Sequence, residues 1–197
     1  ENLFKGLAPW MSRLPGGLIH VNVVGCALFA AISGSSAATV ATVGKMSIPE
    51  LRKRNYPEKL LLGSLAGSGT LGLLIPPSII LIIYGVTVQE SIAKLFIAGI
   101  IPGIMIAIFF MFYVIGWAML NKNIMPKVEE TFSLSQKIKQ SGQLIPVIVL
   151  IAAVIGSIYV GIATATEAAS LGVVGALILS FFQKSLNKET FKLSLLG

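Results

Sequence analysis

The sequence predicts an all-α membrane protein that combines transmembrane helices with one re-entrant hairpin and one broken helix. Three observations lead to this fold class. Hydrophobic residues make up 55% of the 197 residues and charged residues only 12%, a composition typical of membrane proteins. The chain alternates long uncharged apolar runs with short basic segments. Two of the runs also contain glycine, proline and hydroxyl residues, whose polar groups lipid cannot satisfy.

Charge and cysteine content narrow the possibilities further. The net charge is +7, but the basic residues lie between apolar runs rather than along one face, so we do not expect nucleic acid as a partner. Cys26 is the only cysteine, which excludes an intrachain disulfide. The chain does not begin with methionine and has no signal-peptide pattern. We therefore expect an internal piece of a longer protein.

Residues 1–17 are predicted to form an interfacial segment, with Phe4 and Trp10 at headgroup depth. Residues 18–44 are predicted to form the re-entrant hairpin. Its first arm, Leu18–Ile32, is only about 22 Å long as a helix, which is short for a full crossing. One tilted helix over the whole stretch remains the alternative. If the hairpin forms, its tip is a candidate ion- and substrate-binding site, made of Ser33, Gly34, Ser35, Ser36 and Thr39.

Residues 60–85 are predicted to form a broken transmembrane helix. Glycines weaken helix formation and the proline pair disrupts it, which leaves an unwound segment between two half-helices. Such breaks mark ion and substrate sites in secondary transporters. A proline-kinked structural helix is the alternative, but the accompanying glycines and hydroxyls favour a site. The candidate residues are Gly67, Ser68, Gly69, Thr70, Gly72, Pro76, Pro77 and Ser78.

The remaining segments follow from hydropathy and capping patterns. Residues 45–59 form a basic loop, 92–120 a transmembrane helix, 121–141 a polar arm, 144–182 two further transmembrane helices, and 183–197 a basic stretch leading to the next segment. Three pairs have the spacing of a capping box and are assigned structural roles, the first of them in a short surface helix over Pro49–Arg54. The pairs are Ser47 with Glu50, Thr87 with Glu90, and Thr164 with Glu167.

The basic residues also predict an orientation. Segments 1–17, 45–59, 121–141 and 183–197 hold 14 of the 15 lysines and arginines, and only Lys94 lies elsewhere. The positive-inside rule places these four segments in the cytoplasm. A hairpin at 18–44 agrees with this assignment, because it returns the chain to the side from which it entered.

Four stretches together resemble the large membrane subunit of TRAP (tripartite ATP-independent periplasmic) transporters. They are Ser33-Gly-Ser-Ser-Ala-Ala-Thr39, Gly69-Thr-Leu-Gly-Leu-Leu-Ile-Pro-Pro-Ser78, Leu95-Phe-Ile-Ala-Gly-Ile-Ile-Pro-Gly103 and Thr164-Ala-Thr-Glu-Ala-Ala169. The last is usually Thr-Pro-Thr-Glu-Ala-Ala in the family, and alanine at the first helical position should preserve the cap. The family has two inverted repeats, each with a hairpin and a broken helix. Only one set is found here, so the chain would supply half of a site.

The resemblance implies an elevator-type importer in the bacterial inner membrane, with multiple membrane passes and sodium as the coupling ion. The implied cargo is an organic acid such as a dicarboxylate, keto acid or sialic acid. The implied partners are a small membrane subunit, a periplasmic substrate-binding protein and the lipid bilayer. A sodium–anion symporter without a binding protein is the alternative, followed by a passive channel or a membrane scaffold.

The residues themselves favour sodium over protons. Apart from Lys94 near the start of 92–120, the membrane runs contain no aspartate, lysine or arginine, and their one glutamate, Glu167, lies at a helix start. A proton relay normally needs intramembrane carboxylates or histidines, whereas hydroxyls and freed carbonyls suit a hard monovalent cation. We expect no other metal, no cofactor and no enzymatic activity, because no nucleophile, metal cluster or phosphate loop can be assigned.

Overall fold

The computed structural model describes residues 2–126, 133–142 and 144–182, and every regular element in these residues is a helix. The chain divides into two compact units, Glu1–Ile145 and Pro146–Gly197. The α-helices are α1 Asn2–Met11, α2 His20–Ser33, α3 Ser36–Lys53, α4 Glu58–Gly69, α5 Ile79–Val88, α6 Ile92–Leu120, α7 Leu134–Ser141, α8 Ile145–Tyr159 and α9 Ala165–Phe182. Short 3-10 helices are η1 Gly17–Ile19, η2 Thr70–Leu73 and η3 Lys122–Ile124.

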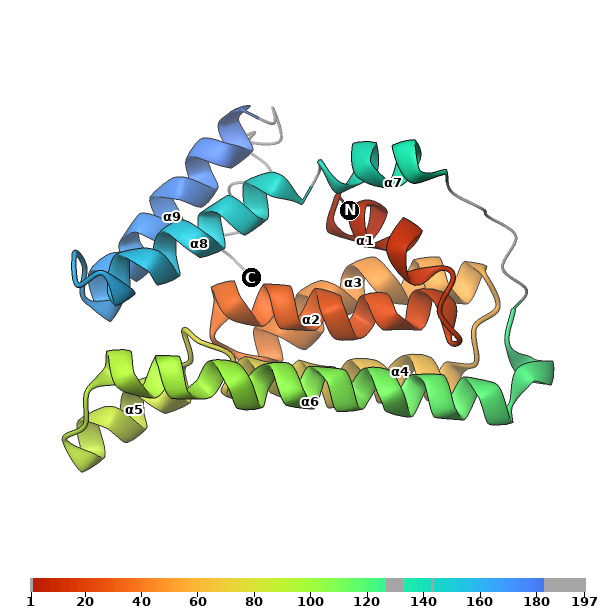
Figure 1. Cartoon of the computed structure of the whole chain (residues 1–197), viewed down its shortest axis with the longest axis horizontal. Helices are drawn as coiled ribbons and strands as arrows, with labels where there is room; N and C mark the ends of the chain where they lie inside the picture. Colours follow the sequence, from red (N-terminus) through yellow and green to blue (C-terminus); the bar gives the residue numbers. More distant parts are fainter. Residues whose placement is uncertain (1, 127–132, 143, 183–197) are drawn as a thin grey trace. The chain divides into compact units, whose positions relative to one another are not determined.

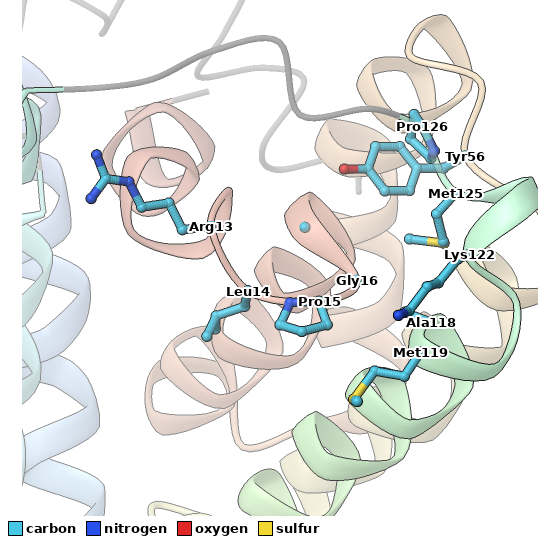
Figure 2. A pocket seen from close by; sticks show the side chains of 11 residues that line it. Arg13, Leu14, Pro15, Gly16, Tyr56, Ala118, Met119, Lys122, Met125 and Pro126 are labelled. Atoms are coloured by element: carbon cyan, nitrogen blue, oxygen red, sulfur yellow. The ribbon is translucent and has the colours of Figure 1, made fainter.

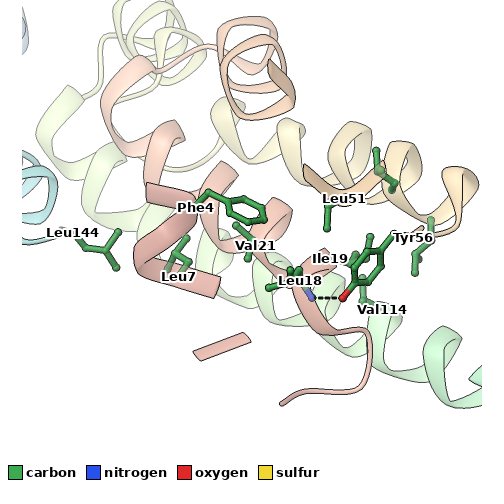
Figure 3. Close-up of a cluster of buried hydrophobic side chains, with 11 residues drawn as sticks. Phe4, Leu7, Leu18, Ile19, Val21, Leu51, Tyr56, Val114 and Leu144 are labelled. Carbon is green, nitrogen blue, oxygen red and sulfur yellow. Dashed lines mark hydrogen bonds between the residues drawn. The ribbon is translucent and has the colours of Figure 1, made fainter. Parts of the chain in front are cut away.

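The first unit is built around α2, which packs against α1, α3, α4 and α6. Figure 1 shows the chain reversing between α2 and α3, so that these helices lie side by side, with α4 and α6 along their flank. A shared apolar core joins one end of this group (Figure 3) and is formed by Phe4, Leu7, Leu18, Ile19, Val21, Leu51, Tyr56, Leu60, Leu61, Val114 and Leu144. Phe4 is buried in this core and not placed for a headgroup belt as predicted, because α1 turns its apolar face inward.

Tyr56 ties the loop after α3 to the start of α2. Its hydroxyl accepts a hydrogen bond of 3.0 Å from the backbone N–H of Leu18, as the dashed line in Figure 3 shows. Burial raises the pKa of the Tyr56 hydroxyl above its ordinary value, so the group stays neutral. A neutral hydroxyl that finds a backbone partner is the usual state of a buried tyrosine.

α3 runs without interruption from Ser36 to Lys53, so the predicted separate surface helix over Pro49–Arg54 is wrong. Thr39, Val43, Ser47 and Leu51 are all buried. Their spacing of four residues puts them on one face of a helix. Packing of this continuous face outweighs the local capping signal and the proline in the helix, so Ser47 caps nothing. Glu50 instead accepts a 2.9 Å hydrogen bond from Arg54, one turn later.

The second predicted capping box is also wrong. Thr87 lies in the last turn of α5, where its hydroxyl donates a 2.8 Å hydrogen bond to the carbonyl of Ile83. Glu90 caps no helix through its side chain in the described contacts, and its N–H bonds the carbonyl of Gly85. Ser91 is the N-cap of α6 and accepts from the N–H of Lys94.

α6 has the bounds that hydropathy predicts, Ile92–Leu120. Among the described residues it is the one helix long and apolar enough to cross a membrane by itself; a second candidate arises only when α7 and α8 are counted as one broken span. Its 29 residues correspond to roughly 43 Å. Isoleucine, methionine, phenylalanine and tyrosine side chains remain exposed along it.

The second unit contains α8 and α9. α8 ends in a Schellman motif at Gly161, whose φ is 75°: the N–H of Ile162 bonds the carbonyl of Ser157, and that of Gly161 bonds Ile158. α9 begins with reciprocal hydrogen bonds between Thr164 and Glu167, of 2.8 Å to the carboxylate and 3.3 Å to the hydroxyl. This is a capping box.

Candidate functional site

The turn between α2 and α3 consists of only Gly34 and Ser35. Gly34 has a left-handed φ of 60° and ends α2 by donating from its N–H to the carbonyl of Ala30. Ser35 is the N-cap of α3 and its hydroxyl accepts from the N–H of Ala38 at 3.4 Å. Glycine at the left-handed position and serine at the N-cap are the residues that such a tight helix–helix turn favours.

A small hydroxyl network closes this turn. The buried Thr39 hydroxyl donates to the carbonyl of Ser35 at 2.7 Å. The Ser33 hydroxyl lies 2.9 Å from the Thr39 hydroxyl and 3.3 Å from the Ser35 carbonyl. A hydroxyl carries one proton and two lone pairs. Those that donate to a carbonyl therefore keep oxygen lone pairs that could face a cation.

The run over residues 60–85 is interrupted between α4 and α5 by η2 and an irregular segment over residues 74–78. The Thr70 hydroxyl donates to the carbonyl of Gly67 at 2.7 Å and is exposed. The Ser78 hydroxyl is buried and donates to the carbonyl of Leu73 at 2.6 Å. The peptide bond between Pro76 and Pro77 is cis. Both hydroxyls thus pair with carbonyls at the interruption.

The turn and the interruption are in direct backbone contact. The N–H of Ile79 donates to the carbonyl of Gly34 at 3.3 Å. A side-chain Cβ at Gly34 would lie 2.5 Å from the carbonyl oxygen of Pro77, and one at Gly72 would lie 2.8 Å from the backbone of Ser35. Both distances are shorter than van der Waals contact allows. Glycine is therefore required on each side for the two segments to approach this closely.

Not every predicted site residue takes part in this contact. Gly69 faces the side chain of Val40, and a Cβ added at Gly67 would lie 3.1 Å from the ring of Phe110. Ser68 is buried, and its hydroxyl donates to the carbonyl of Ser64 at 2.6 Å and lies 3.4 Å from the carbonyl of Asn22 on α2. The residues that the structure brings together are those of the turn with Gly72, Pro77 and Ser78.

α6 shows how deep this contact lies. A Cβ at Gly99 would be 2.8 Å from the carbonyl of Leu74, and one at Gly103 would be 2.8 Å from the side chain of Ile75. These glycines lie about 10 and 16 Å along α6 from its start. The interruption is therefore level with the inner part of the long apolar helix and not with either end.

Four helix ends meet at this contact. α3 and α5 begin here, at Ser36 and Ile79, while α2 and η2 end here, at Ser33 and Leu73. Helix N-termini carry partial positive charge and attract anions, and helix C-termini carry partial negative charge and attract cations. The arrangement offers both kinds of terminus within one contact, without an ionisable side chain.

A buried polar cluster between α2 and α4 was not found from the sequence. Asn22 on α2 is fully buried, and its Nδ2 donates to the carbonyl of Leu61 at 3.2 Å and to the hydroxyl of Ser64 at 3.0 Å. The cluster ties α2 to α4. A single asparagine in an apolar run gives no periodic signal; its polarity alone could have indicated a buried contact.

Among the described residues, no group of three or more histidine, cysteine, aspartate or glutamate side chains could hold a metal ion. His20 is buried and its Nε2 lies 2.8 Å from the carbonyl of Pro15, which fixes the start of α2. The chemistry of the site is therefore that of hydroxyls, backbone carbonyls and helix ends.

The regular elements of the described residues are all helices, and one of them is long and apolar enough to cross a membrane, which is consistent with a membrane protein. A family model described as "Tripartite ATP-independent periplasmic transporter, DctM component" matches residues 1–196. The chain belongs to this family.

Curated relatives support the same family membership. The chain is 36% identical over 173 residues to the C4-dicarboxylate TRAP transporter large permease protein DctM of Pseudomonas aeruginosa, which covers 87% of this chain and 40% of the relative. It is 38% identical to the isethionate TRAP transporter permease protein DctMQ of Oleidesulfovibrio alaskensis, in an alignment that covers 87% of this chain and 27% of the relative. It is 35% identical to the sialic acid TRAP transporter permease protein SiaT of Haemophilus influenzae, in an alignment that covers 96% of this chain and 30% of the relative. The chain thus spans less than half the length of these relatives.

Proposed function

We propose that this chain is part of a sodium-coupled secondary importer of small organic acids in the bacterial inner membrane. The observation that carries the proposal is the backbone contact between the turn at Gly34–Ser35 and the interruption around Gly72–Ser78. In the proposed membrane placement the turn is the tip of a re-entrant hairpin, and the interrupted run is a broken transmembrane helix. The tip and the break together form half of the transport site.

Sodium fits this half-site better than a proton does. The groups available are the hydroxyls of Ser33, Thr39 and Ser78, which donate to neighbouring carbonyls and keep lone pairs. The exposed hydroxyl of Thr70, at the start of η2, is a further candidate. Oxygen ligands of this kind, together with helix C-termini, coordinate sodium in transporters with broken helices. An ion shared between the tip and the break would favour their contact, because a ligand shifts an equilibrium toward the state it binds more tightly.

An acidic substrate fits the two helix N-termini at the same contact. The starts of α3 and α5 supply backbone N–H groups and partial positive charge. The relatives are named for C4-dicarboxylate, isethionate and sialic acid, all of which carry an acidic group. The proposed cargo is therefore an organic acid of the dicarboxylate, keto acid or sialic acid class.

The rest of the proposal follows from family membership. The tip and the broken helix would travel as one body past a static scaffold, in an elevator movement. A small membrane subunit would support the scaffold, and a periplasmic binding protein would deliver the substrate. The remainder of the site would come from the second repeat.

Reconstituted transport tests the function as a whole. The complete transporter is placed in liposomes, and uptake of labelled organic acids is measured with and without a sodium gradient and with and without the binding protein. We expect uptake only when sodium and the binding protein are both present. Uptake without the binding protein would favour a simpler sodium–anion symporter, and uptake without a sodium gradient would refute coupling.

Side-chain variants test the site. Ser35→Ala and Thr70→Ala should raise the sodium concentration needed for half-maximal transport and for thermal stabilisation. Ser35 is also an N-cap, so Ser91→Ala serves as the matched control: Ser91 caps α6 with the same 3.4 Å bond to a backbone N–H. The control should lose stability without changing the sodium midpoint. Equal midpoints in all four proteins would remove these side chains from the site.

A further inference from the structure

An open pocket of about 420 Å³ lies where the segment before α2 meets the residues that follow α6. Figure 2 shows Arg13 and Leu14 on one side of it and Ala118, Met119 and Lys122 on the other. Tyr56, Met125 and Pro126 also line it. The pocket is separate from the contact between the Gly34–Ser35 turn and the Gly72–Ser78 interruption, because it adjoins the C-terminal end of α6 and not the part around Gly99 and Gly103.

The two charged residues of the pocket are both cations. Arg13 and Lys122 are exposed, and no ion pair joins either to another described residue. Two described carboxylates of the same unit, Glu50 and Glu58, are bonded to Arg54 and Arg52. Within the part of the chain that the structure describes, no acidic side chain lines the pocket. The charged side chains in the described lining of the pocket are therefore both positive.

The rest of the described lining is mostly apolar, and Met119 belongs to the exposed apolar surface of α6. Met119 is 55% exposed and Leu120 is 87% exposed, and Lys122 follows them within one turn. A cation directly after an apolar span lies at headgroup depth. Basic pockets at the cytoplasmic ends of membrane helices suit anionic lipid headgroups, because the phosphate meets the cations while an acyl chain covers the apolar wall. A free phosphate ion would use only the charged half of the pocket.

We propose that this pocket binds the phosphate of an anionic phospholipid from the cytoplasmic leaflet. Lys122 extends into the pocket, whereas the Arg13 guanidinium is turned outward in Figure 2. Arg13 has no described side-chain partner to lose, so it can swing toward the phosphate. The bound headgroup links the base of the α2–α3 hairpin to the end of α6 and stabilises their packing. The orientation of the lipid rests on the membrane placement of the proposed function.

Thermal unfolding of the complete transporter in neutral detergent tests the site. Phosphatidylglycerol, phosphatidylcholine or inorganic phosphate is titrated against wild type and Arg13→Gln/Lys122→Gln, in the absence of sodium. Lys45→Gln/Lys59→Gln is the control, since it also removes two exposed cations from the same unit, and neither lines the pocket. Arg13→Lys/Lys122→Arg keeps both charges and should behave like wild type.

We expect phosphatidylglycerol to raise the melting temperature of wild type and of the control. The apparent affinity should fall about 5-fold for each cation removed from the pocket. Equal shifts with phosphatidylcholine, an equal shift with inorganic phosphate alone, or the same loss in the control would each overturn the proposal. Because uptake is measured separately, a protein with sodium-coupled uptake and no lipid shift would refute only the lipid site.

Discussion

Replacing Gly72 with alanine should separate the turn between α2 and α3 from the interruption between α4 and α5. The added Cβ would lie 2.8 Å from the carbonyl carbon of Ser35 and from the N of Ser36, and 2.9 Å from the Ser35 oxygen. All three are backbone atoms of the turn, so no side chain can rotate away. Carbon atoms are in favourable contact at about 3.5–4.0 Å, so the two segments must move apart by several tenths of an ångström.

The energetic cost can be bounded. Adding a methyl group to a packed interior typically costs about 1–3 kcal/mol, and here the obstacle is main chain. If sodium binding depends on this contact, the same free energy appears as a weaker apparent affinity, by roughly 5- to 150-fold for one coupled ion. Thermal stability and the sodium midpoint should therefore change together.

Gly63→Ala is the matched control. Gly63 lies on α4, in the same run, and a Cβ there meets nothing within 4 Å. Alanine should leave stability unchanged or raise it by up to about 1 kcal/mol through helix propensity. The assay is thermal unfolding of the complete transporter across a sodium titration. A Gly72→Ala protein with wild-type stability and midpoint would show that the contact is not as close as the structure has it.

Three further outcomes are expected. Thr164→Ala should remove an N-cap worth about 1 kcal/mol and lower the melting temperature without moving the sodium midpoint; the reverse pattern would assign the residue to the ion site. In a Cys26→Ser background, cysteines at the exposed positions Lys59 and Glu90 should be labelled from opposite sides of the membrane, and labelling from one side would refute the topology. A hydrogen bond from Arg52 lowers the pKa of the Glu58 carboxyl. Any stabilisation by this pair is therefore present above the pKa of the unfolded state, and it disappears as the pH falls through the lower pKa of the folded state. Unfolding curves of wild type and Glu58→Gln should differ slightly at neutral pH, because the pair is exposed, and converge in acid; a gap that widens in acid would contradict this.

Features encoded by local composition were predictable. The bounds of α6 follow from an uninterrupted apolar run, and the interruption in 60–85 follows from Gly72 and the proline pair. Capping signals were less informative. Of the three predicted boxes only that of Thr164 forms, while an unpredicted one forms at Ser133 before α7. A capping-box spacing makes a helix start possible at that position, and tertiary packing decides whether a helix begins there.

The course of α3 shows why packing decides. The sequence around Ser47 has both a cap spacing and a proline, and each signals a helix start. Yet Val43 and Leu51 pack into two different apolar clusters of the first unit, and a continuous helix reaches both. Their partners come from residues far along the chain, such as Leu65 and Val114. The sequence of α3 alone therefore does not reveal that the helix continues through Ser47.

The glycines of the interrupted run make the same point for the site. From the sequence they are equivalent, since each lowers helix propensity by a similar amount. In the fold Gly63 faces open space, Gly67 faces an aromatic ring on α6, Gly69 faces a valine on α3, and Gly72 faces the main chain of the hairpin turn. Only at the last position does the missing side chain bring two irregular backbones together. The proposed sodium site requires such a contact, because in that proposal the ligands of one ion come from both segments at once.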